Sequence, residues 1–164
     1  MRKPLYVLLI LAVVHGATAV AAPPRVEAGP ALGVMSYRSP EAHTVPIGGL
    51  EVLLSRNAFA LHVTEEYADL TGLGTLTATH AGVLYSHPLG EMWVRTGGGV
   101  SFVSVTNLES ATTWNAEAEI SRRWGRADVF ARLRYCRFTL NGFREQARVR
   151  GPVAFVGVRF VVWE

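Results

Sequence analysis

The stretch TTWNAEAEISRRWGRADVFARLRY (112–135) decides the fold, because it is typical of two strands joined by a tight turn. Gly125 stands at the first central position of a two-residue loop with Arg126, where a type II′ turn requires glycine. Such a turn fixes the register of the antiparallel pair, so that the numbers of facing residues sum to 251. The charged facing pairs are then Glu119 with Arg132, Glu117 with Arg134, and Arg123 with Asp128.

Side chains alternate across a strand, so these three ion pairs fall on one face of the hairpin. The other face carries uncharged facing pairs: Ala116 with Tyr135, Ala118 with Leu133, and Ile120 with Ala131. A strand that is ionic on one face and apolar on the other is typical of a barrel with hydrocarbon outside and a polar filling inside.

The start of the chain predicts export. Arg2 and Lys3 precede an apolar run over 5–14, and small residues follow up to Ala21. This is the pattern of a secretory signal peptide over 1–21, too short for a spanning helix. We expect cleavage there, an irregular lead-in over 22–28, and one barrel domain over 29–164 located in the outer membrane.

Composition argues against several other classes of protein. After removal of Arg2 and Lys3 the chain has 14 Arg, no Lys and 13 acidic residues, and no basic run longer than Arg122-Arg123. A nucleic-acid partner is therefore not indicated. The single cysteine, Cys136, excludes an intramolecular disulfide. The five histidines show no metal-ligand spacing, and we expect no metal and no cofactor.

Alternating hydrophobicity predicts eight antiparallel strands and no helix. The expected spans are 29–38, 43–55, 58–67, 75–86, 91–105, 111–124, 127–139 and 152–163. The expected short turns are 56–57, 87–90 and 125–126, and the expected longer loops are 39–42, 68–74, 106–110 and 140–151. Short turns at one end and longer loops at the other are typical of outer-membrane barrels, and an even strand count places both termini at the short-turn end.

Aromatic residues are expected to form two girdles at the membrane interfaces. The candidates are Tyr85, Trp93, Trp124 and Trp163 near the turns, and Tyr67, Phe102, Trp114, Tyr135 and Phe138 near the loops. The alternation does not decide which face of the first strand points inward.

The same register argument, extended to the other turns, predicts a filled polar lumen. Glu51 should face His62, Arg95 should face Gly82, and His80 should face Gly97. Gly97 and Gly99 would leave room for long arginine side chains. An eight-stranded barrel is only wide enough for side chains, so we expect no large pore. The predicted lumen network is Glu117, Glu119, Arg132, Arg134, Arg123, Asp128, Arg95, Arg159, Glu51, His62 and His80.

Three stretches, WVRTGGGVSF (93–102), FARLRYCRF (130–138) and FVGVRFVVWE (155–164), carry a resemblance. The chain resembles the small eight-stranded outer-membrane β-barrels, including OmpA-like and OmpX-like domains. This resemblance implies a monomeric up-and-down transmembrane barrel that contacts outer-membrane lipid and is inserted by the barrel-assembly machinery. Members usually end in an aromatic residue, whereas Trp163 is penultimate here.

Some barrels of this size are lipid A deacylases with a serine, a histidine and an acid. The candidate residues are His62, His80, Ser101, Glu66 and Glu117. The predicted register separates Ser101 from His80 by about four residues, too far for a nucleophile and its base. We therefore expect a non-catalytic protein with a structural, adhesion or surface-recognition role that uses the 140–151 loop.

A soluble periplasmic barrel of lipocalin type, with the faces inverted around an apolar ligand, is the other interpretation. Exposed ion pairs would then contribute only about 0–1 kcal/mol each. An arginine on a lipid-facing surface costs roughly 2–4 kcal/mol at the midplane. The clean separation of charged from apolar faces therefore favours the membrane.

Overall fold

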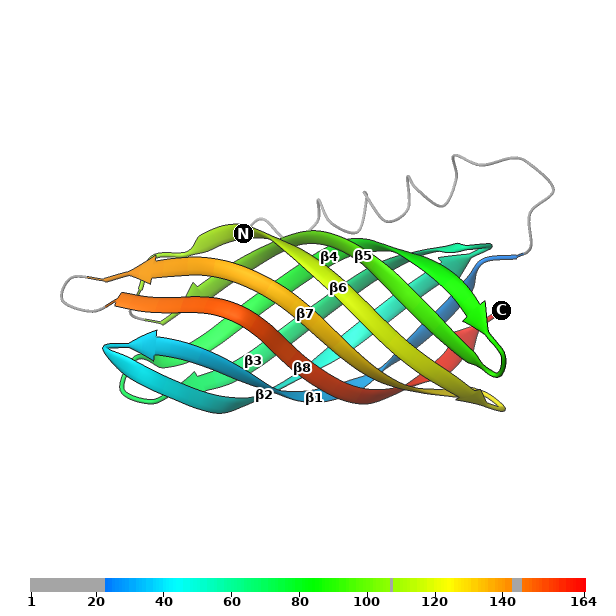
Figure 1. Cartoon of the computed structure of the whole chain (residues 1–164), viewed down its shortest axis with the longest axis horizontal. Helices are drawn as coiled ribbons and strands as arrows, with labels where there is room; N and C mark the ends of the chain where they lie inside the picture. The colour runs from blue at the N-terminus through cyan, green and yellow to red at the C-terminus, as the bar shows by residue number, and fades with distance from the viewer. Residues whose placement is uncertain (1–22, 107, 143–145) are drawn as a thin grey trace.

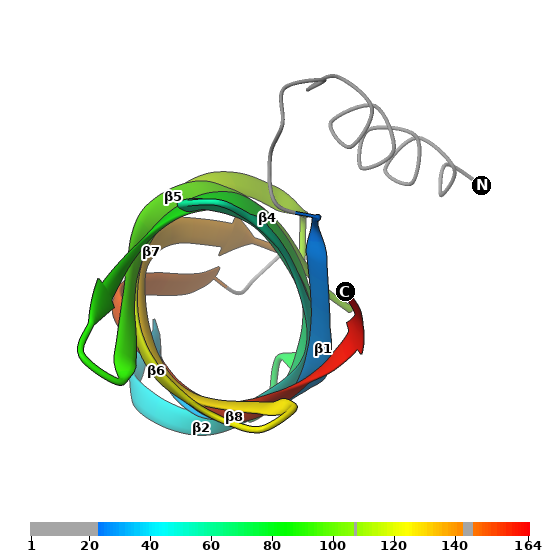
Figure 2. The same cartoon turned by 90° about the vertical axis from the view of Figure 1, so that its right-hand side faces the viewer.

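The computed structural model describes residues 23–106, 108–142 and 146–164, which form a closed antiparallel barrel (Figures 1 and 2). The strands are β1 (Arg25–Ser39), β2 (Glu41–Arg56), β3 (Phe59–Leu70), β4 (Gly74–Leu89), β5 (Met92–Val105), β6 (Ala111–Trp124), β7 (Ala127–Asn141) and β8 (Gln146–Trp163). Each strand pairs with its neighbours in sequence, and β1 pairs with β8 to close the ring. The predicted eight-stranded up-and-down barrel is confirmed, while the predicted signal peptide lies outside the described residues.

The first strand starts earlier than predicted. Residues 25–28 belong to β1 and not to an irregular lead-in, because they pair with β2 on one side and largely with β8 on the other. Glu27 is fully buried in this segment. The odd-numbered side chains Met35 and Tyr37 point inward, whereas Leu32 and Val34 are exposed on the outside.

Three two-residue turns join the strands at the end where β1 begins and β8 ends, here called the turn end (Figure 1). They are 57–58, 90–91 and 125–126. The first residue of each has a positive φ: 56° for Asn57, 62° for Gly90 and 58° for Gly125. A positive φ at this position matches the right-handed twist of the flanking strands, so each turn sets the register of its hairpin.

The register of the β6–β7 hairpin is confirmed, and two other predicted registers are wrong. Glu51 pairs with Thr64, because the turn after β2 is Asn57-Ala58 and not Arg56-Asn57. The β4–β5 hairpin is shifted by four, because His87, Pro88 and Leu89 continue β4.

The β4–β5 shift changes the cross-strand partners of Arg95 and His80 in the predicted network, and of Gly97. Ser86 therefore faces Arg95, and Ser101 faces His80. Gly97 lies opposite Leu84 and Glu117.

At the opposite end of the barrel, here called the loop end, three of the four connections are shorter than predicted, and 106–110 has the predicted bounds. The four connections are Pro40 alone, 71–73, 106–110 and 142–145. The expected loop over 140–151 is wrong, because Asn141 pairs with Gln146 and both strands continue to this point. The strands have 12 to 18 residues, more than the 9–11 that a membrane-spanning strand needs.

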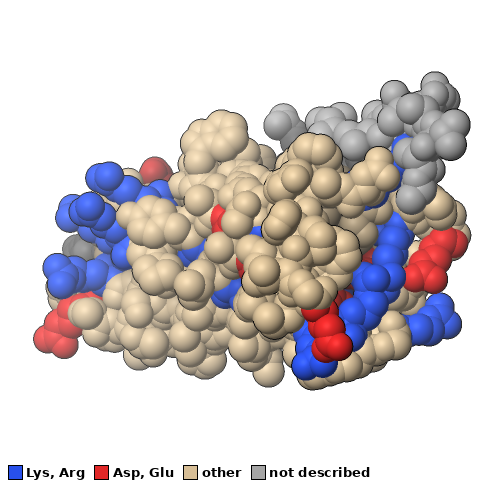
Figure 3. All heavy atoms as spheres, turned by 45° about the vertical axis from the view of Figure 1, so that its right-hand side comes forward, with Lys and Arg blue, Asp and Glu red and all other residues tan. Residues whose placement is uncertain are grey.

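The outside of the barrel is apolar around its middle. On the face shown in Figure 3, charged side chains gather toward the ends and leave a largely uncharged band between them. Exposed aromatic residues border this band: Phe59, Tyr85, Trp124 and Trp163 toward the turn end, and Tyr67, Phe102, Trp114 and Tyr135 toward the loop end. The girdle prediction fails for Phe138, which is buried inside the barrel. No helix in the described part of the chain is long and apolar enough to cross a membrane.

Candidate functional site

The lumen holds a balanced set of buried charges. Six carboxylates are buried: Glu27, Glu51, Glu66, Glu117, Glu119 and Asp128. Four arginines are buried with them, Arg95, Arg132, Arg134 and Arg159, and the partly exposed Arg25 and Arg123 reach Glu27 from the turn end. Six guanidinium groups thus face six carboxylates, so the lumen is close to electrical neutrality. Neutrality matters because an unpaired charge in such a site costs several kcal/mol.

Near the turn end, Arg159 and Arg95 converge on the same two carboxylates. Arg159 Nη2 lies 2.6 Å from Glu119 Oε1 and 2.9 Å from Asp128 Oδ2. Arg95 Nη1 donates to the same oxygens at 2.6 and 3.2 Å and to the Ser121 hydroxyl at 2.7 Å. Two guanidinium groups sharing two carboxylates form a network, not a set of isolated pairs.

In the middle of the barrel, Arg132 and His62 connect carboxylates from two strands. Arg132 Nη2 lies 2.7 Å from Glu51 Oε2, and its Nη1 donates to His62 Nε2 at 2.7 Å. His62 Nδ1 lies 3.1 Å from Glu117 Oε2, and its Nε2 also lies 3.4 Å from Glu51 Oε2. His62 therefore bridges Arg132 and two carboxylates.

Closer to the loop end, Arg134 links Glu117 to Glu66. Its Nε lies 3.0 Å from Glu117 Oε1, and its Nη1 lies 2.6 Å from Glu66 Oε1. The Thr64 hydroxyl donates to the same Glu66 oxygen at 3.0 Å. The ring of Phe155 lies between the arginines, with its centroid 5.1 Å from the Arg132 Cζ and 5.2 Å from the Arg134 Cζ. Guanidinium faces on aromatic rings partly replace the water that these groups lose on burial.

The network ends in a chain of Glu66, His80, Ser101 and Asn115. His80 Nε2 donates to Glu66 Oε2 at 2.9 Å, and the Ser101 hydroxyl hydrogen-bonds His80 Nδ1. Asn115 Nδ2 donates to Ser101 Oγ at 2.6 Å. The prediction that Ser101 lies out of reach of His80 is wrong, because it rested on the incorrect β4–β5 register. The serine, histidine and acid stand in the hydrogen-bonded order of a hydrolase triad, although Nδ1 takes the place that Nε2 has at the serine of chymotrypsin-like enzymes.

Access to this serine is closed in the described structure. Ser101 has no exposed surface, and His80 is 4% exposed. The adjoining cavity, which His80 and Glu66 line together with Met35, Cys136 and Phe138, has a volume of about 10 Å³. That is room for no more than one water, and not for an acyl chain.

Beyond this chain the lumen changes character. The inward side chains at the loop end are apolar and buried: Met35, Tyr37, Val45, Ile47, Ala68, Leu70, Leu73, Leu76, Ala78, Val103, Val105, Cys136, Phe138, Leu140, Ala147, Val149 and Val153. We call this group the apolar cap. The alternation of charged and apolar residues predicts a polar filling throughout the lumen, whereas the apolar cap fills its loop end with hydrophobic side chains.

The eleven residues of the predicted network all lie on the inner face of the barrel. Their partners differ in part from those predicted: Arg123 pairs with Glu27 and not with Asp128, its neighbour in register. Glu27 was missed because it precedes the predicted first strand. Glu66 was considered only as a catalytic acid, although its alternation with His62 and Thr64 in β3 placed it on the inner face.

The structure gives a reason for the glycines of β5 that differs from the predicted one, namely close packing against the backbone of β4. A Cβ on Gly97 would lie 2.0 Å from the backbone oxygen of Val83, and one on Gly99 would lie 2.0 Å from that of Ala81. These glycines allow the β4 and β5 backbones to approach closely. The atoms nearest to each added Cβ belong to the β4 backbone and not to an arginine side chain.

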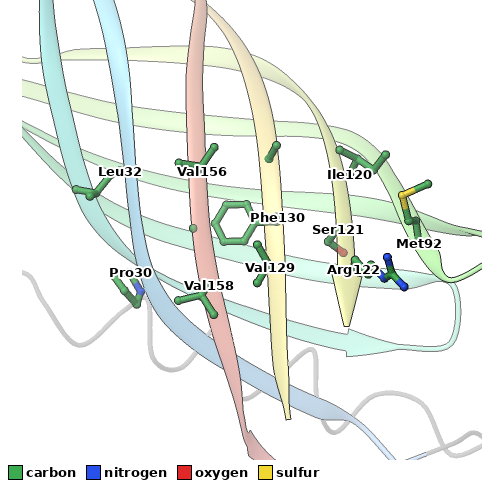
Figure 4. A pocket seen from close by; sticks show the side chains of 12 residues that line it. Pro30, Leu32, Met92, Ile120, Ser121, Arg122, Val129, Phe130, Val156 and Val158 are labelled. Atoms are coloured by element: carbon green, nitrogen blue, oxygen red, sulfur yellow. The ribbon is translucent and has the colours of Figure 1, made fainter. Parts of the chain in front are cut away.

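Outside the barrel, a shallow apolar groove of about 620 Å³ crosses β8, β7 and β6 (Figure 4). Figure 4 shows Leu32, Val156, Val129 and Ile120 along it. These four side chains belong to β1, β8, β7 and β6 and lie on the outer surface of the barrel. A lipocalin has the reverse arrangement, because it buries its apolar residues around a ligand. The inverted-face interpretation is therefore wrong, because the charged side chains lie inside and the apolar belt lies outside.

No group of three or more metal-ligating side chains with suitable geometry occurs among the described residues. The histidines near carboxylates, His62 and His80, instead serve as hydrogen-bond bridges within the network.

Comparison with solved structures shows which known proteins share this fold. No protein-family model and no curated protein matches the sequence. Among solved structures, the chain is similar to neisserial surface protein A, with 14% identity and a TM-score of 0.67 over 87% of this chain and 99% of that one. It is also similar to the N-terminal β-barrel domain of OprF from Pseudomonas aeruginosa, with 14% identity and a TM-score of 0.58 over 86% of this chain and 98% of that one. The chain thus has the fold of the small eight-stranded outer-membrane barrels, and the predicted resemblance is confirmed.

Proposed function

We propose that this protein is a non-catalytic barrel of the bacterial outer membrane, with a plugged lumen and a structural or recognition role at the cell surface. The observation that carries the proposal is the combination of an apolar outer belt with an interior filled along its length. Lipid would cover the belt, and the lumen would conduct neither solutes nor ions.

The proposed orientation places the loop end outside the cell. β1 begins and β8 ends at the turn end, and the short turns of outer-membrane barrels face the periplasm. Because β7 and β8 extend into the predicted 140–151 loop, the proposed surface contact involves the strand rims and the connections at the loop end, among them 71–73.

Fractionation and surface labelling test the location and the orientation together. We expect the full chain in the outer-membrane fraction, with a gel mobility that shifts on heating. A Ser110→Cys variant should react with an impermeant maleimide on intact cells, whereas Glu91→Cys, at the turn end, should react only after lysis. Cys136 is buried and provides no background label. Release with the periplasmic contents, or labelling at Glu91→Cys alone, would contradict the proposal.

Conductance tests the plugged lumen. Purified protein in a planar bilayer should give no stable channel steps, because charged residues and the apolar cap together occupy the interior. Regular open-channel steps that disappear with the protein omitted would show that the filling is mobile.

A second candidate function, a barrel-type lipid hydrolase, is favoured by the Glu66–His80–Ser101 chain alone. It requires the wall or the cap to open, because Ser101 has no exposed surface. We expect no Ser101-dependent labelling by a fluorophosphonate probe in outer-membrane preparations. A label that is present in the wild type and absent in Ser101→Ala would favour the hydrolase over the structural protein.

A further inference from the structure

Four arginines on the outer face at the loop end form a cluster of a different kind from those in the lumen. They are Arg38 on β1, Arg137 on β7, and Arg148 and Arg150 on β8, and all four are exposed. Their strands are adjacent in the barrel, and Arg and Lys side chains gather at this end in Figure 3. We call them the rim arginines.

The register sets like charges directly opposite each other. Arg38 pairs with Arg148 across the β1–β8 seam, and Arg137 pairs with Arg150 between β7 and β8. Facing residues of this kind have Cβ atoms about 4.5–5.5 Å apart, and like charges there are destabilising. Two such pairs lie side by side on three strands.

No carboxylate compensates this charge within the described part of the chain. None of the ion pairs among residues 23–106, 108–142 and 146–164 includes a rim arginine. Arg148 donates instead to the neutral Gln146 side chain at 2.8 Å. By contrast, Arg122, an exposed arginine at the turn end, is paired with Glu91.

The position of the cluster relative to the apolar belt indicates its partner. Tyr135 and Pro152 form the next outward-facing pair toward the middle of the barrel, and Tyr135 belongs to the aromatic girdle. The adjacent pair is Leu133 with Ala154, and the apolar groove begins at Ala131 and Val156. Two residues of a strand advance roughly 6–7 Å, so the guanidinium groups lie just beyond the girdle, at the depth of lipid headgroups.

Guanidinium groups bind phosphate with paired hydrogen bonds, and they do so best where several converge. Resting on the proposed membrane location, we infer that the rim arginines bind the headgroup of an outer-leaflet lipid that carries more than one phosphate. Its acyl chains lie along the apolar wall of β7 and β8. The lipid supplies the negative charge that the described residues around the rim arginines do not.

The test uses the full chain folded in neutral detergent and a bisphosphorylated diglucosamine lipid, with native mass spectrometry to count bound lipid. We expect the wild type to retain the lipid and Arg137→Gln/Arg150→Gln to retain it with an affinity lower by about tenfold or more. Arg122→Gln is the matched control, because it removes an exposed arginine at the other end, and it should leave retention unchanged. The dephosphorylated lipid should not be retained, and inorganic phosphate should not displace the intact lipid.

A stability measurement separates this site from a general loss of folding. Without lipid, Arg150→Gln should raise the unfolding temperature, since it relieves the repulsion from Arg137. With the bisphosphorylated lipid added, the same variant should be stabilised less than the wild type. This reversal of sign is not expected for a variant that merely folds poorly.

Several outcomes would overturn the inference. They are undiminished retention in the double variant, equal retention of phosphatidylglycerol, displacement by free phosphate, and equally tight arginine-dependent binding of a soluble sulfated polysaccharide. The last result would assign the rim to an extracellular polyanion and not to a lipid. None of these results would affect the fractionation and labelling that test the proposed function.

Discussion

The two halves of the lumen are built from the same eight strands and are filled in opposite ways. From the turn end to His80 the interior is dominated by arginines and carboxylates, with the small apolar cluster of Leu53, Ala60 and Leu84 among them. From Cys136 to Leu140 it is as apolar as the core of a soluble protein. Buried ion pairs regain little more than the cost of their desolvation, but breaking one of them is expensive. Apolar side chains stabilise by burial alone and tolerate exchange among themselves. The ionic half therefore specifies one arrangement, while the apolar cap supplies stability and closes the barrel.

The largest effect is expected from Glu119→Leu, which breaks the ionic half at a carboxylate that three arginines share. Glu119 lies within 4.0 Å of Arg95, Arg132 and Arg159, so its loss leaves guanidinium charge uncompensated. We expect a loss of about 3–5 kcal/mol in the free energy of unfolding. Heat-dependent gel mobility in detergent measures the unfolding temperature. An unchanged temperature would show that the network does not stabilise the barrel.

A somewhat smaller effect is expected from Leu76→Ala in the apolar cap. Leu76 is 1% exposed, so truncation leaves a cavity and should cost about 2–4 kcal/mol. Combined with Glu119→Leu, the two losses should add to within about 0.5 kcal/mol, because Leu76 and Glu119 lie toward opposite ends of the lumen. Strong coupling between the two changes would mean that the halves do not act separately.

The double variant Glu119→Leu/Arg95→Met sharpens the distinction between charge and packing. It removes one carboxylate and one guanidinium group, so the lumen returns to balance. We expect it to be about 1–3 kcal/mol more stable than Glu119→Leu alone. Urea titration in vesicles measures the difference. If the double variant is the less stable of the two, the stability of the ionic half depends on the geometry of its contacts and not on charge balance.

The smallest effect is expected from Arg122→Gln, which removes an exposed ion pair with Glu91. Because water and salt screen such a pair, the change in unfolding free energy should stay below about 1 kcal/mol. A loss as large as that of Glu119→Leu would show that burial is not what distinguishes the lumen pairs.

The parts of the fold that were predictable from sequence are those where the chain is amphipathic and the turn is unambiguous. Gly125 marks its turn, and the alternation of charged with apolar residues on both sides leaves one possible register. The β4–β5 register was missed because His87 and Pro88 resemble a loop, although the positive φ needed for the turn belongs to Gly90. That error alone hid the contact between His80 and Ser101.

The apolar cap was not predictable by the same reasoning. Alternation identifies the inner face only where the two faces differ, and near the loop end both are apolar, as Leu32, Val34 and Met35 illustrate in β1. The ion partners in the network also depend on which strands meet across the lumen. Pairings such as Arg134 with Glu66, which are 68 positions apart, follow from the closure of the barrel and not from any hairpin.

The contribution of β8 to the ionic half bears on how the barrel is assembled. Arg159 reaches carboxylates from β1, β2, β6 and β7, and it lies on the last strand of the chain. A nascent sheet that lacks β8 therefore carries excess negative charge on the surface that will become its interior. Pairing of β8 with β1 and β7 closes the barrel and neutralises these carboxylates in the same step. An incomplete barrel is therefore poorly suited to the membrane, and a complete barrel is hard to reopen.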